Sequence, residues 1–251
     1  MTNIILSGCS GKMGASIISC AAQRTDCRII AGIDIAEPQN ADFDYAKGFS
    51  ELKTEGDVII DFSNPVVLDS MLSYATEKKI PCVICTTGYN DEQKKKIHEA
   101  SKIIPVFYSG NMSLGINLII ELAKKAASVF GEDFDVEIVE QHHNQKLDAP
   151  SGTALMIADA VKEVRKESEY VYDRHAYRKK REKKEIGIHS VRGGNIVGEH
   201  EIIFAGTDEV LTISHSARSK TVFAVGAVNA AVFLKGKEPG MYDMSDLLAS
   251  K

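Results

Sequence analysis

The sequence lacks any apolar run of the length that a membrane-spanning helix needs. Such a helix requires roughly 18 consecutive apolar residues, and no run of this kind occurs in the 251 residues. The chain also enters a strand-like segment at once, instead of a basic and then apolar leader. We therefore expect no membrane partner and a cytoplasmic location.

Cysteines are few, and their distribution does not fit a disulfide framework. The five cysteines all lie within the first 85 residues, and an odd, scattered set argues against paired bridges. Cys82 and Cys85 have the spacing of a redox motif, but residues i and i+3 of a strand point to opposite faces of the sheet. We expect both thiols to be buried and inert.

Neither sign of charge is in strong excess. The formal net charge is −5 and the isoelectric point is near 5.8, which gives no general reason to bind nucleic acid. A basic run at 178–184 lacks the interleaved aromatic residues that nucleic-acid sites combine with such clusters. We expect this run to be a solvated loop, no nucleic-acid partner, and a small-molecule ligand instead.

The start of the chain is typical of a dinucleotide site. An apolar run at 3–7 is followed by Gly8-Cys9-Ser10-Gly11-Lys12-Met13-Gly14, after which apolar residues recur at helical spacing from Ile17. A second apolar run, at 28–33, ends on Asp34. In a βαβ unit the glycines let a pyrophosphate approach a helix N-terminus, and the acid receives ribose hydroxyls. The GxxGxxG spacing is less common than GxGxxG, so tight packing of the turn is the alternative.

Strand-like and helical segments then alternate. Strands are predicted at 57–63, 82–86 and 105–108, and helices at 65–79 and 91–102. Repeated β-α-β units predict a parallel, doubly wound sheet, and in such sheets ligands bind beyond the carboxyl ends of the strands. Two strand-end loops are therefore candidates for the cofactor site, although each alone also fits a plain surface turn: Thr86-Thr87-Gly88 and Ser109-Gly110-Asn111-Met112.

The pattern changes after a long helix predicted at 114–130. One convincing helix, at 153–166, occurs among four strands predicted in close succession at 136–139, 187–192, 196–205 and 210–214. This pattern indicates a mixed or antiparallel sheet in a second domain. A final helix at 222–234 can pack against the first domain, and a short tail follows from Gly240.

The stretch 140–154 concentrates the polar chemistry. His142 and His143 follow a predicted strand, Lys146 comes next, and Pro150-Ser151-Gly152-Thr153 opens an apolar helix. Adjacent histidines on a strand face opposite ways, so they are poorly placed to share a metal, and we expect none.

An ammonium, an imidazole and a helix N-terminus together form a receptor for carboxylates, to which Ser151, Gly152 and Thr153 add N–H groups and two hydroxyls. The remaining imidazole, with an ordinary pKa of about 6.5, suits a proton donor near neutral pH. The alternative is one solvent-facing histidine and one that is hydrogen-bonded in a core.

This stretch, read with 8–14 and with Thr86-Thr87-Gly88, closely resembles dihydrodipicolinate reductase, also called 4-hydroxy-tetrahydrodipicolinate reductase, of the diaminopimelate route to lysine. The resemblance extends over essentially the whole chain, including 197–200 and 240–244. It implies reduction of a cyclic imine dicarboxylate by NADH or NADPH, with hydride addition at ring C4 and protonation at C3. It also implies a homotetramer, commonly formed through the sheet of the second domain.

Position by position, the resemblance assigns His142 as the proton donor and Lys146 as the second catalytic residue. It assigns the substrate-carboxylate contacts to His143, Gly152 and Thr153, to which the reasoning above adds Ser151. The cofactor positions are Gly8, Cys9, Ser10, Gly11, Lys12, Met13, Asp34, Cys85, Thr86, Thr87, Ser109, Gly110, Asn111 and Met112.

The expected fold class is α/β, with a Rossmann-like parallel-sheet domain and an α+β domain that has a mixed sheet. We expect residues 1–112 and 220–251 to form the dinucleotide-binding domain. Residues 113–219 are expected to form the domain that binds substrate and carries oligomerisation.

Two positions depart from the family pattern. Cys85 stands where many members have glycine, so the backbone approach to a cofactor there can differ. Ile35 stands where some members have an arginine that can pair with a 2′-phosphate. Without that arginine Asp34 should repel the phosphate, although Lys12 can offset the repulsion. We expect use of both cofactors with a preference for NADH.

Two other functions remain open. Another two-domain dehydrogenase, acting on an amino acid or an oxo acid, explains the glycine loop but not the cluster at 142–153. A non-catalytic, NAD-sensing regulator needs a DNA-binding or partner module. Only the basic run at 178–184 supports such a regulator, and the sequence shows no recognisable helix-turn-helix.

Overall fold

The structure is a computed structural model that describes residues 1–38 and 42–250. The chain forms two compact units, the first from Met1–Leu114 together with Lys220–Lys251, and the second from Gly115–Ser219. Each unit has its own sheet, with apolar cores on both faces of the first sheet and on one face of the second. We describe the two units separately.

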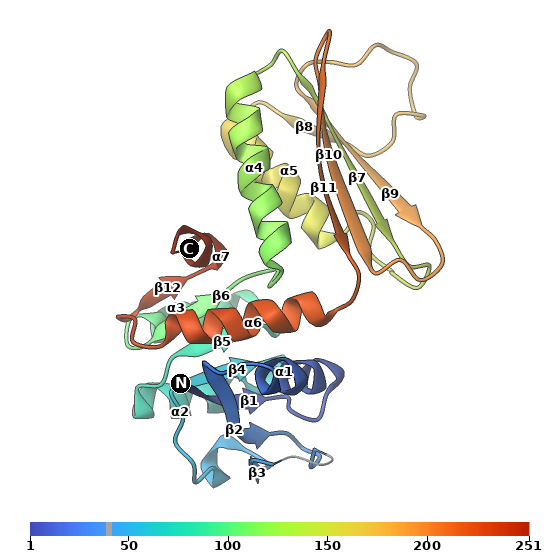
Figure 1. Ribbon diagram of the computed structural model, residues 1–251. Helices are drawn as coiled ribbons and strands as arrows, with labels where there is room; N and C mark the ends of the chain where they lie inside the picture. Colours follow the sequence, from blue (N-terminus) through green and yellow to red (C-terminus); the bar gives the residue numbers. More distant parts are fainter. Residues whose placement is uncertain (39–41, 251) are drawn as a thin grey trace. The chain divides into compact units, whose positions relative to one another are not determined.

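The first unit is built on a seven-stranded sheet in the order β12-β6-β5-β4-β1-β2-β3 (Figure 1). All of its strand pairs are parallel, so the predicted doubly wound sheet is confirmed. Residues of the central strands are buried because helices cover both faces. The strands are β1 (Thr2–Ser7), β2 (Cys27–Ile33), β3 (Asp44–Ala46), β4 (Val58–Asp61), β5 (Cys82–Ile84), β6 (Pro105–Tyr108) and β12 (Gly240–Tyr242).

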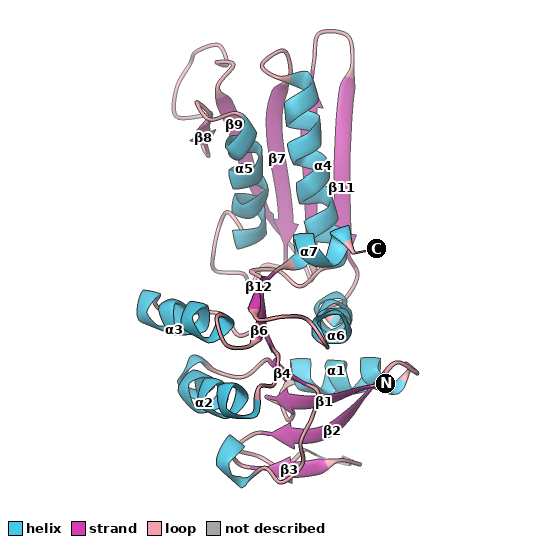
Figure 2. Cartoon of the chain, turned by 90° about the vertical axis from the view of Figure 1, so that its left-hand side faces the viewer, coloured by secondary structure: helices cyan, strands magenta, loops and turns pink. Residues whose placement is uncertain are grey.

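Helices cover the two faces of this sheet in two groups (Figure 2). One apolar core packs α1 (Lys12–Ala22), α6 (Thr221–Leu234) and α7 (Met244–Ala249) against one face. The other core packs α2 (Leu68–Lys78) and α3 (Asp91–Ser101) against the opposite face. Short 3-10 turns at Phe49–Glu51 and Pro65–Val67 complete the unit.

The cysteines illustrate how the strand period divides the two cores. Cys82 is buried in the core beneath α2 and α3, whereas Cys85 is buried in the core beneath α1 and α6. All five cysteines are free thiols. The prediction that Cys82 and Cys85 are buried on opposite faces is therefore confirmed.

The segment after Gly240, predicted as a tail, is ordered structure. Met244 and Leu247 are buried in the core of the first unit. The helix begins there because Asp243 and Asp246 form a capping box, in which each side chain accepts from the backbone N–H of the other residue.

The second unit contains a five-stranded sheet in the order β11-β10-β7-β9-β8. β11 and β7 are antiparallel to β10, whereas β9 is parallel to both β7 and β8, which confirms the predicted mixed sheet. Two helices lie on one face of this sheet in both views (Figures 1 and 2). The elements are α4 (Leu114–Phe130), β7 (Asp135–His142), α5 (Gly152–Val164), β8 (Glu169–Val171), β9 (Glu185–Arg192), β10 (Gly198–Ala205) and β11 (Val210–Ala217).

The basic run at 178–184 is only partly the solvated loop that we expected. Six of its seven residues are exposed, but Arg181 is not. Arg181 donates to Asp135 at 2.7 Å and to Glu137 at 2.9 Å, and also to the Val136 carbonyl. This one side chain therefore fastens the loop to the start of β7.

Gly226 is a point of close approach between α6 and the loop that follows β6. A β-carbon at this position would overlap the carbonyl oxygen of Met112, which is backbone and cannot rotate away. The glycine is required by this approach of helix to loop, and not by any unusual backbone angle.

We predict that Gly226→Ala destabilises the protein by about 1–3 kcal/mol through overpacking. Helix propensity alone predicts the opposite sign, because alanine is favoured over glycine by roughly 1 kcal/mol inside a helix. Urea unfolding of wild type and variant measures the difference.

The control is Gly48→Ala, since a β-carbon at Gly48 meets nothing within 4 Å. Its effect should stay within about 0.5 kcal/mol. A Gly226→Ala protein that is as stable as wild type would contradict the close approach.

Candidate active site

Strand β7 places an acidic residue in the apolar row that faces α4 and α5. Val136, Ile138, Glu140 and His142 are the buried residues of this strand. Their alternation with less buried neighbours is the period-2 pattern of a half-covered sheet. Glu140 is completely buried, and His142 is 9% exposed.

The Glu140 carboxylate accepts hydrogen bonds from side chains and from the backbone. His142 Nδ1 lies 2.6 Å from Oε2, and the Ser151 backbone N–H donates to Oε1 at 3.1 Å. The Arg192 guanidinium donates through Nη1 to Oε2 at 2.8 Å and through Nη2 to Oε1 at 2.7 Å. Such a forked pair is the strong geometry for arginine and a carboxylate.

These contacts keep the carboxylate ionised. Burial alone would raise the pKa of Glu140, but hydrogen bonds from Arg192, Ser190 and His142 outweigh it and lower the pKa to about 2. Burial lowers the pKa of His142 below its usual 6.5, and Glu140 opposes that shift. Since Glu140 is a charged acceptor, the proton on Nδ1 of His142 points to it, and Nε2 is the nitrogen left for other chemistry.

The space beside Nε2 depends on a glycine. A β-carbon on Gly198, the first residue of β10, would lie 3.1 Å from His142 Nε2. His200 packs edge-on to His142 with the ring centroids 5.3 Å apart. Burial lowers the pKa of His200 to about 4, so this second imidazole is neutral near pH 7.

Ser151 is used inside the protein. Its hydroxyl accepts from the Ala154 N–H at 3.1 Å, which caps α5, and lies 3.0 Å from His200 Nε2. With 2% exposure, its side chain is among the most buried polar groups of the chain. The predicted substrate contact through this hydroxyl therefore has a competing structural role, which fixes where the N-terminus of α5 begins.

The loop after β7 carries the other predicted residues. β7 ends at His142, and His143 already belongs to the loop, half-buried where His142 is buried. Lys146 is ion-paired with Asp148 at 2.8 Å. Arg192 donates to the Asp148 carbonyl at 2.7 Å, so the guanidinium that holds Glu140 also holds this loop.

The second unit thus brings together most of the residues predicted for chemistry. One region of this unit contains the buried imidazole of His142, the ammonium of Lys146 and the N-terminus of α5. Nδ1 of this imidazole is already hydrogen-bonded to Glu140. Arg192 and His200 were not predicted. Only the register of the strands indicates that they belong to the site. Arg192 on β9 pairs with His142 on β7, and His200 on β10 pairs with Glu140 on β7.

The predicted cofactor residues lie in the first unit, at the carboxyl ends of β1, β2, β5 and β6. The Asp34 carboxylate accepts from the backbone N–H of Ser10 at 2.9 Å and of Ile35 at 2.8 Å. Ser10, Gly11 and Lys12 are exposed. Parallel strands end at the same edge of a sheet, which is the ligand-binding edge in folds of this kind.

The three glycines of the first loop differ in what requires them. Gly8 has φ +85, and a β-carbon there would overlap the Phe62 carbonyl. A β-carbon on Gly14 would overlap the Gly8 carbonyl. Gly11 has no such constraint, because its β-carbon would be in ordinary contact with the Gly8 carbonyl at 3.4 Å.

The missing side chain at Gly11 instead leaves the N-terminus of α1 open. A cavity of about 470 Å³ adjoins it, bounded by Gly8, Gly11, Asp34, Ile35 and Asn64 among others. An open helix N-terminus beside an acidic residue fits the pyrophosphate and ribose of a dinucleotide.

The two remaining cofactor loops are more enclosed. Cys85 and Thr86 are buried, and the Thr86 hydroxyl accepts from the Ser63 N–H at 2.8 Å. Met112 is also buried, and Ser109 donates to the Asn111 carbonyl at 3.0 Å. Among the predicted positions of these loops, the exposed ones are Thr87 and Gly110.

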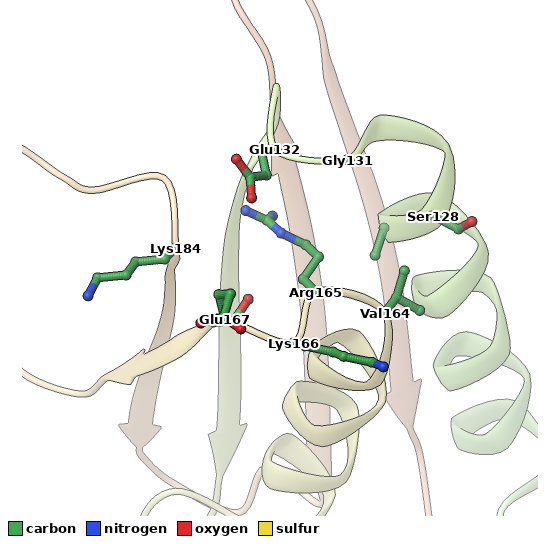
Figure 3. A pocket seen from close by; sticks show the side chains of 10 residues that line it. Ser128, Gly131, Glu132, Val164, Arg165, Lys166, Glu167 and Lys184 are labelled. Carbon is green, nitrogen blue, oxygen red and sulfur yellow. The ribbon is translucent and has the colours of Figure 1, made fainter.

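Another cavity, of about 280 Å³, lies where α4 and α5 end (Figure 3). Arg165 extends towards Glu132 in this view, and Lys166 points the other way. The Arg165 guanidinium donates to the Phe134 and Lys183 carbonyls, so it ties α5 to neighbouring backbone. None of the residues predicted for chemistry lines this cavity.

Within residues 1–38 and 42–250, no group of three or more histidine, cysteine, aspartate or glutamate side chains is arranged to hold a metal ion. The helices of this described part are all too short or too polar to cross a membrane.

The chain is similar to known proteins along its whole length. Residues 2–112 match a family model described as dihydrodipicolinate reductase, N-terminus, and residues 115–248 match its C-terminus counterpart. The 4-hydroxy-tetrahydrodipicolinate reductase of Clostridium tetani is 50% identical over 251 residues, which cover 100% of this chain and 98% of that protein. The reductase of the same name from Caldanaerobacter subterraneus subsp. tengcongensis is 52% identical over 249 residues, covering 99% and 98%.

A solved structure, a dipicolinate-bound dihydrodipicolinate reductase from Paenisporosarcina sp. TG-14, superposes with a TM-score of 0.80. It is 25% identical, and the match covers 97% of each chain. The similarity therefore includes both units, each with its own sheet.

The paired state of Glu140 makes a prediction about stability and pH. Its folded pKa of about 2 is below the ordinary value of 4.5, so the stabilisation is fully present above about pH 5 and is lost as the pH falls towards 2. The free energy of unfolding of wild type should fall by about 2 kcal/mol more between pH 5 and pH 3 than that of Glu140→Gln. Urea unfolding at both pH values measures it.

Glu209→Gln is the control, because Glu209 is an exposed carboxylate in the turn between β10 and β11. Its pH dependence should match that of wild type. An equal fall in wild type and Glu140→Gln would show that Glu140 does not carry this linkage.

Proposed function

Because the chain belongs to the dihydrodipicolinate reductase family, we propose that its reaction adds hydride to ring C4 and a proton to ring C3 of a cyclic imine dicarboxylate. Members of the family are NAD(P)H-dependent oxidoreductases of lysine and diaminopimelate biosynthesis. The product is tetrahydrodipicolinate, formed from 4-hydroxy-tetrahydrodipicolinate (dihydrodipicolinate).

The observation that carries the proposal is the environment of His142. Its Nδ1 is hydrogen-bonded to a buried carboxylate, and Gly198 places no side chain against Nε2. In the imidazolium form Nε2 carries a proton that can be delivered to a carbon made electron-rich by hydride addition. The proposed role of His142 is therefore that of a general acid.

Carboxylate groups of the substrate are proposed to bind the loop and the helix that follow His142. Gly152 and Thr153 form the first turn of α5, where backbone N–H groups favour an anion. Lys146 and His143 add charge and a polar ring. Since Lys146 is paired with Asp148 at 2.8 Å, a substrate carboxylate would compete with Asp148 for the ammonium.

The position of Ser151 supports a different role from the predicted one. Its hydroxyl caps α5 and contacts His200, and its backbone N–H donates to Glu140. We therefore assign Ser151 to positioning the N-terminus of α5, and leave the direct contacts to its neighbours.

The dinucleotide, when bound, supplies the hydride. The open N-terminus of α1 at Gly11 is the proposed pyrophosphate site, with residues from Gly8 to Met13 around it. Asp34 is the proposed ribose ligand. At the other two loops, the exposed positions Thr87 and Gly110 are the ones that can approach a cofactor.

We propose that NADH is preferred over NADPH. The Asp34 carboxylate, which already accepts two backbone N–H groups, is the charge nearest to a 2′-phosphate in this arrangement. Ile35 is 90% exposed and offers no compensating charge, whereas the exposed ammonium of Lys12 does. This balance supports use of both cofactors with a lean towards NADH.

We also propose that the chain forms a homotetramer through the sheet of the second unit. The face of this sheet opposite α4 and α5 presents half-buried Val139 and Ile203. Partly exposed apolar residues in the middle of a sheet face favour burial against another copy.

The test of the reaction is a coupled assay with the synthase that acts one step earlier. Nuclease-free protein should oxidise NADH only when the product of that synthase is supplied. Oxidation with an unrelated amino acid or oxo acid would favour another dehydrogenase, and binding of NADH without turnover would favour a sensor.

We predict that His142→Ala lowers kcat by about 10²–10⁴, the scale for losing a general acid, while the protein stays folded. Steady-state kinetics in the coupled assay and circular dichroism measure the two properties. The matched control is His189→Ala, because His189 is paired with Glu137 at 2.8 Å on the other face of the sheet. Its kcat should equal that of wild type, and normal turnover by His142→Ala would remove the proton-donor assignment.

For the cofactor, we predict that Ile35→Arg raises kcat/KM with NADPH by roughly tenfold, because a guanidinium pairs well with a 2′-phosphate. The value with NADH should change little. Ile35→Gln, of similar reach but without charge, is the control. A wild-type enzyme that already prefers NADPH strongly would contradict the proposed lean towards NADH.

A further inference from the structure

Glu140 and Arg192 form the contact on which this inference is built. In the parallel pairing of β7 and β9, Arg192 stands directly beside His142. Its guanidinium turns back to Glu140, with both nitrogens within 2.8 Å of the two carboxylate oxygens. The same Nη2 donates to the Asp148 carbonyl.

We propose that the Glu140–Arg192 pair is a positioning device, in which Glu140 orients the His142 ring and favours its proton-donating form, and Arg192 holds Glu140 in place. This proposal rests on the proposed function, because it concerns how the proposed general acid is held. Glu140 acts through His142 and is not assigned any contact with substrate.

The chemistry explains why a carboxylate is needed at Nδ1. A neutral His142 whose proton lies on Nδ1 has a lone pair on Nε2 and cannot donate from it. The imidazolium has protons on both nitrogens. When the Nε2–H bond breaks, its electron pair stays on the ring, and the electron-rich C3 supplies the pair for the new C–H bond. The ring becomes neutral, with its remaining proton on Nδ1 and hydrogen-bonded to the Glu140 carboxylate. Water then returns a proton to Nε2.

The charged groups around His142 have opposite effects on the stability of its imidazolium form. Lys146 from the loop and Arg192 from β9 both disfavour the imidazolium, as does burial. Glu140 on β7 favours it. The groups from the other two neighbouring elements, Ser151 on α5 and His200 on β10, add no positive charge near neutral pH.

Arg192 has a separate part in this arrangement. A carboxylate buried beside one imidazole is ordinarily driven towards its neutral form, because burial penalises the charge. The forked contact with Arg192 keeps Glu140 ionised, and an ionised Glu140 can then act on His142. By donating to Asp148, Arg192 also sets the loop that carries Lys146 relative to the same carboxylate.

The test is the pH profile of kcat/KM for Glu140→Gln. The glutamine keeps the size of the side chain and an acceptor for Nδ1–H, but removes the charge. Loss of an opposite charge in contact should move the basic limb of the profile to lower pH by about 1–2 units. The activity should then be near that of wild type on the acid side and fall by about 10–100-fold on the basic side. A loss that is uniform across the pH range overturns the proposal.

The matched control is Glu137→Gln. Glu137 lies on the same strand and is also paired with an arginine and a histidine, Arg181 and His189, but on the opposite face of the sheet. Size-exclusion chromatography first checks that this variant keeps the oligomeric state of wild type, because Glu137 lies on the sheet face proposed to join the copies. With the same oligomeric state, its profile should overlay that of wild type. A shift as large as that of Glu140→Gln would mean that the effect is one of general charge, which contradicts a specific device.

A second variant removes the risk that an unpaired Arg192 unfolds the protein. Glu140→Gln combined with Arg192→Gln leaves no unpaired buried charge, so stability should recover relative to the single variant. The basic limb of the kcat/KM profile should still lie at lower pH than in wild type, because the carboxylate in contact with Nδ1 is gone. Recovery of the wild-type profile together with stability would show that the pair has only a structural role.

Nuclear magnetic resonance of the histidine ring separates this proposal from the proposed function. In the wild-type protein, His142 should carry its proton on Nδ1 when neutral, and its pKa should fall by about 1–2 units in Glu140→Gln. This measurement needs no turnover. If wild type is inactive but its ring titrates as expected, the proposed function is wrong and the proposal about the Glu140–Arg192 pair stands. If the pKa of His142 is the same in Glu140→Gln as in wild type, the proposal about the pair is wrong, even in an active enzyme.

Discussion

A single buried carboxylate connects the elements of the second unit that carry chemistry. Glu140 occupies a core position of β7 and is completely enclosed, so its charge must be balanced by contacts within the protein. Those contacts come from β9 through Arg192, from the start of α5 through Ser151, and from β7 itself through His142. Breaking a buried pair of this kind typically costs about 3–5 kcal/mol. The position of the helix, the loop and the imidazole therefore all depend on one charge.

Much of the fold was predictable because its longer elements have clear periodicity. The helix at Leu114–Phe130 and the strand at Pro105–Tyr108 agree with their predicted bounds. The three-residue strands Asp44–Ala46, Glu169–Val171 and Gly240–Tyr242 were not predicted. A three-residue strand contains too few residues to show an alternation, and its place in a sheet depends on neighbours that are distant in the sequence. The helix after Asp243 was missed although its capping residues are visible in the sequence.

The candidate site was predictable only where its residues are close in sequence. His142, Lys146 and the start of α5 lie within one short stretch, and a pattern of residues can show them together. Arg192 and His200 reach the same place through the register of β9 and β10 with β7, which no local pattern contains. Glu140 did have a local signal. It stands in the buried row of an alternating strand, where an acid must have partners, and those partners had to come from elsewhere in the fold.

Strand β7 shows how the covering of a sheet decides what a charge cluster can do. Glu137 and Glu140 are three residues apart, and each is held by one arginine and one histidine. Within a single copy of the chain, Glu137 lies on the face opposite α4 and α5, where its side chain is 23% exposed and that of His189 is 43% exposed. Water therefore screens these interactions in the monomer, and each contributes little there. Glu140 lies under α4 and α5 with no exposure. Water therefore does not screen the interactions of its charge with an arginine and a histidine. On the covered face, burial and the Glu140 carboxylate both act on the protonation of His142. This is the side of the strand on which the proposed proton donor stands.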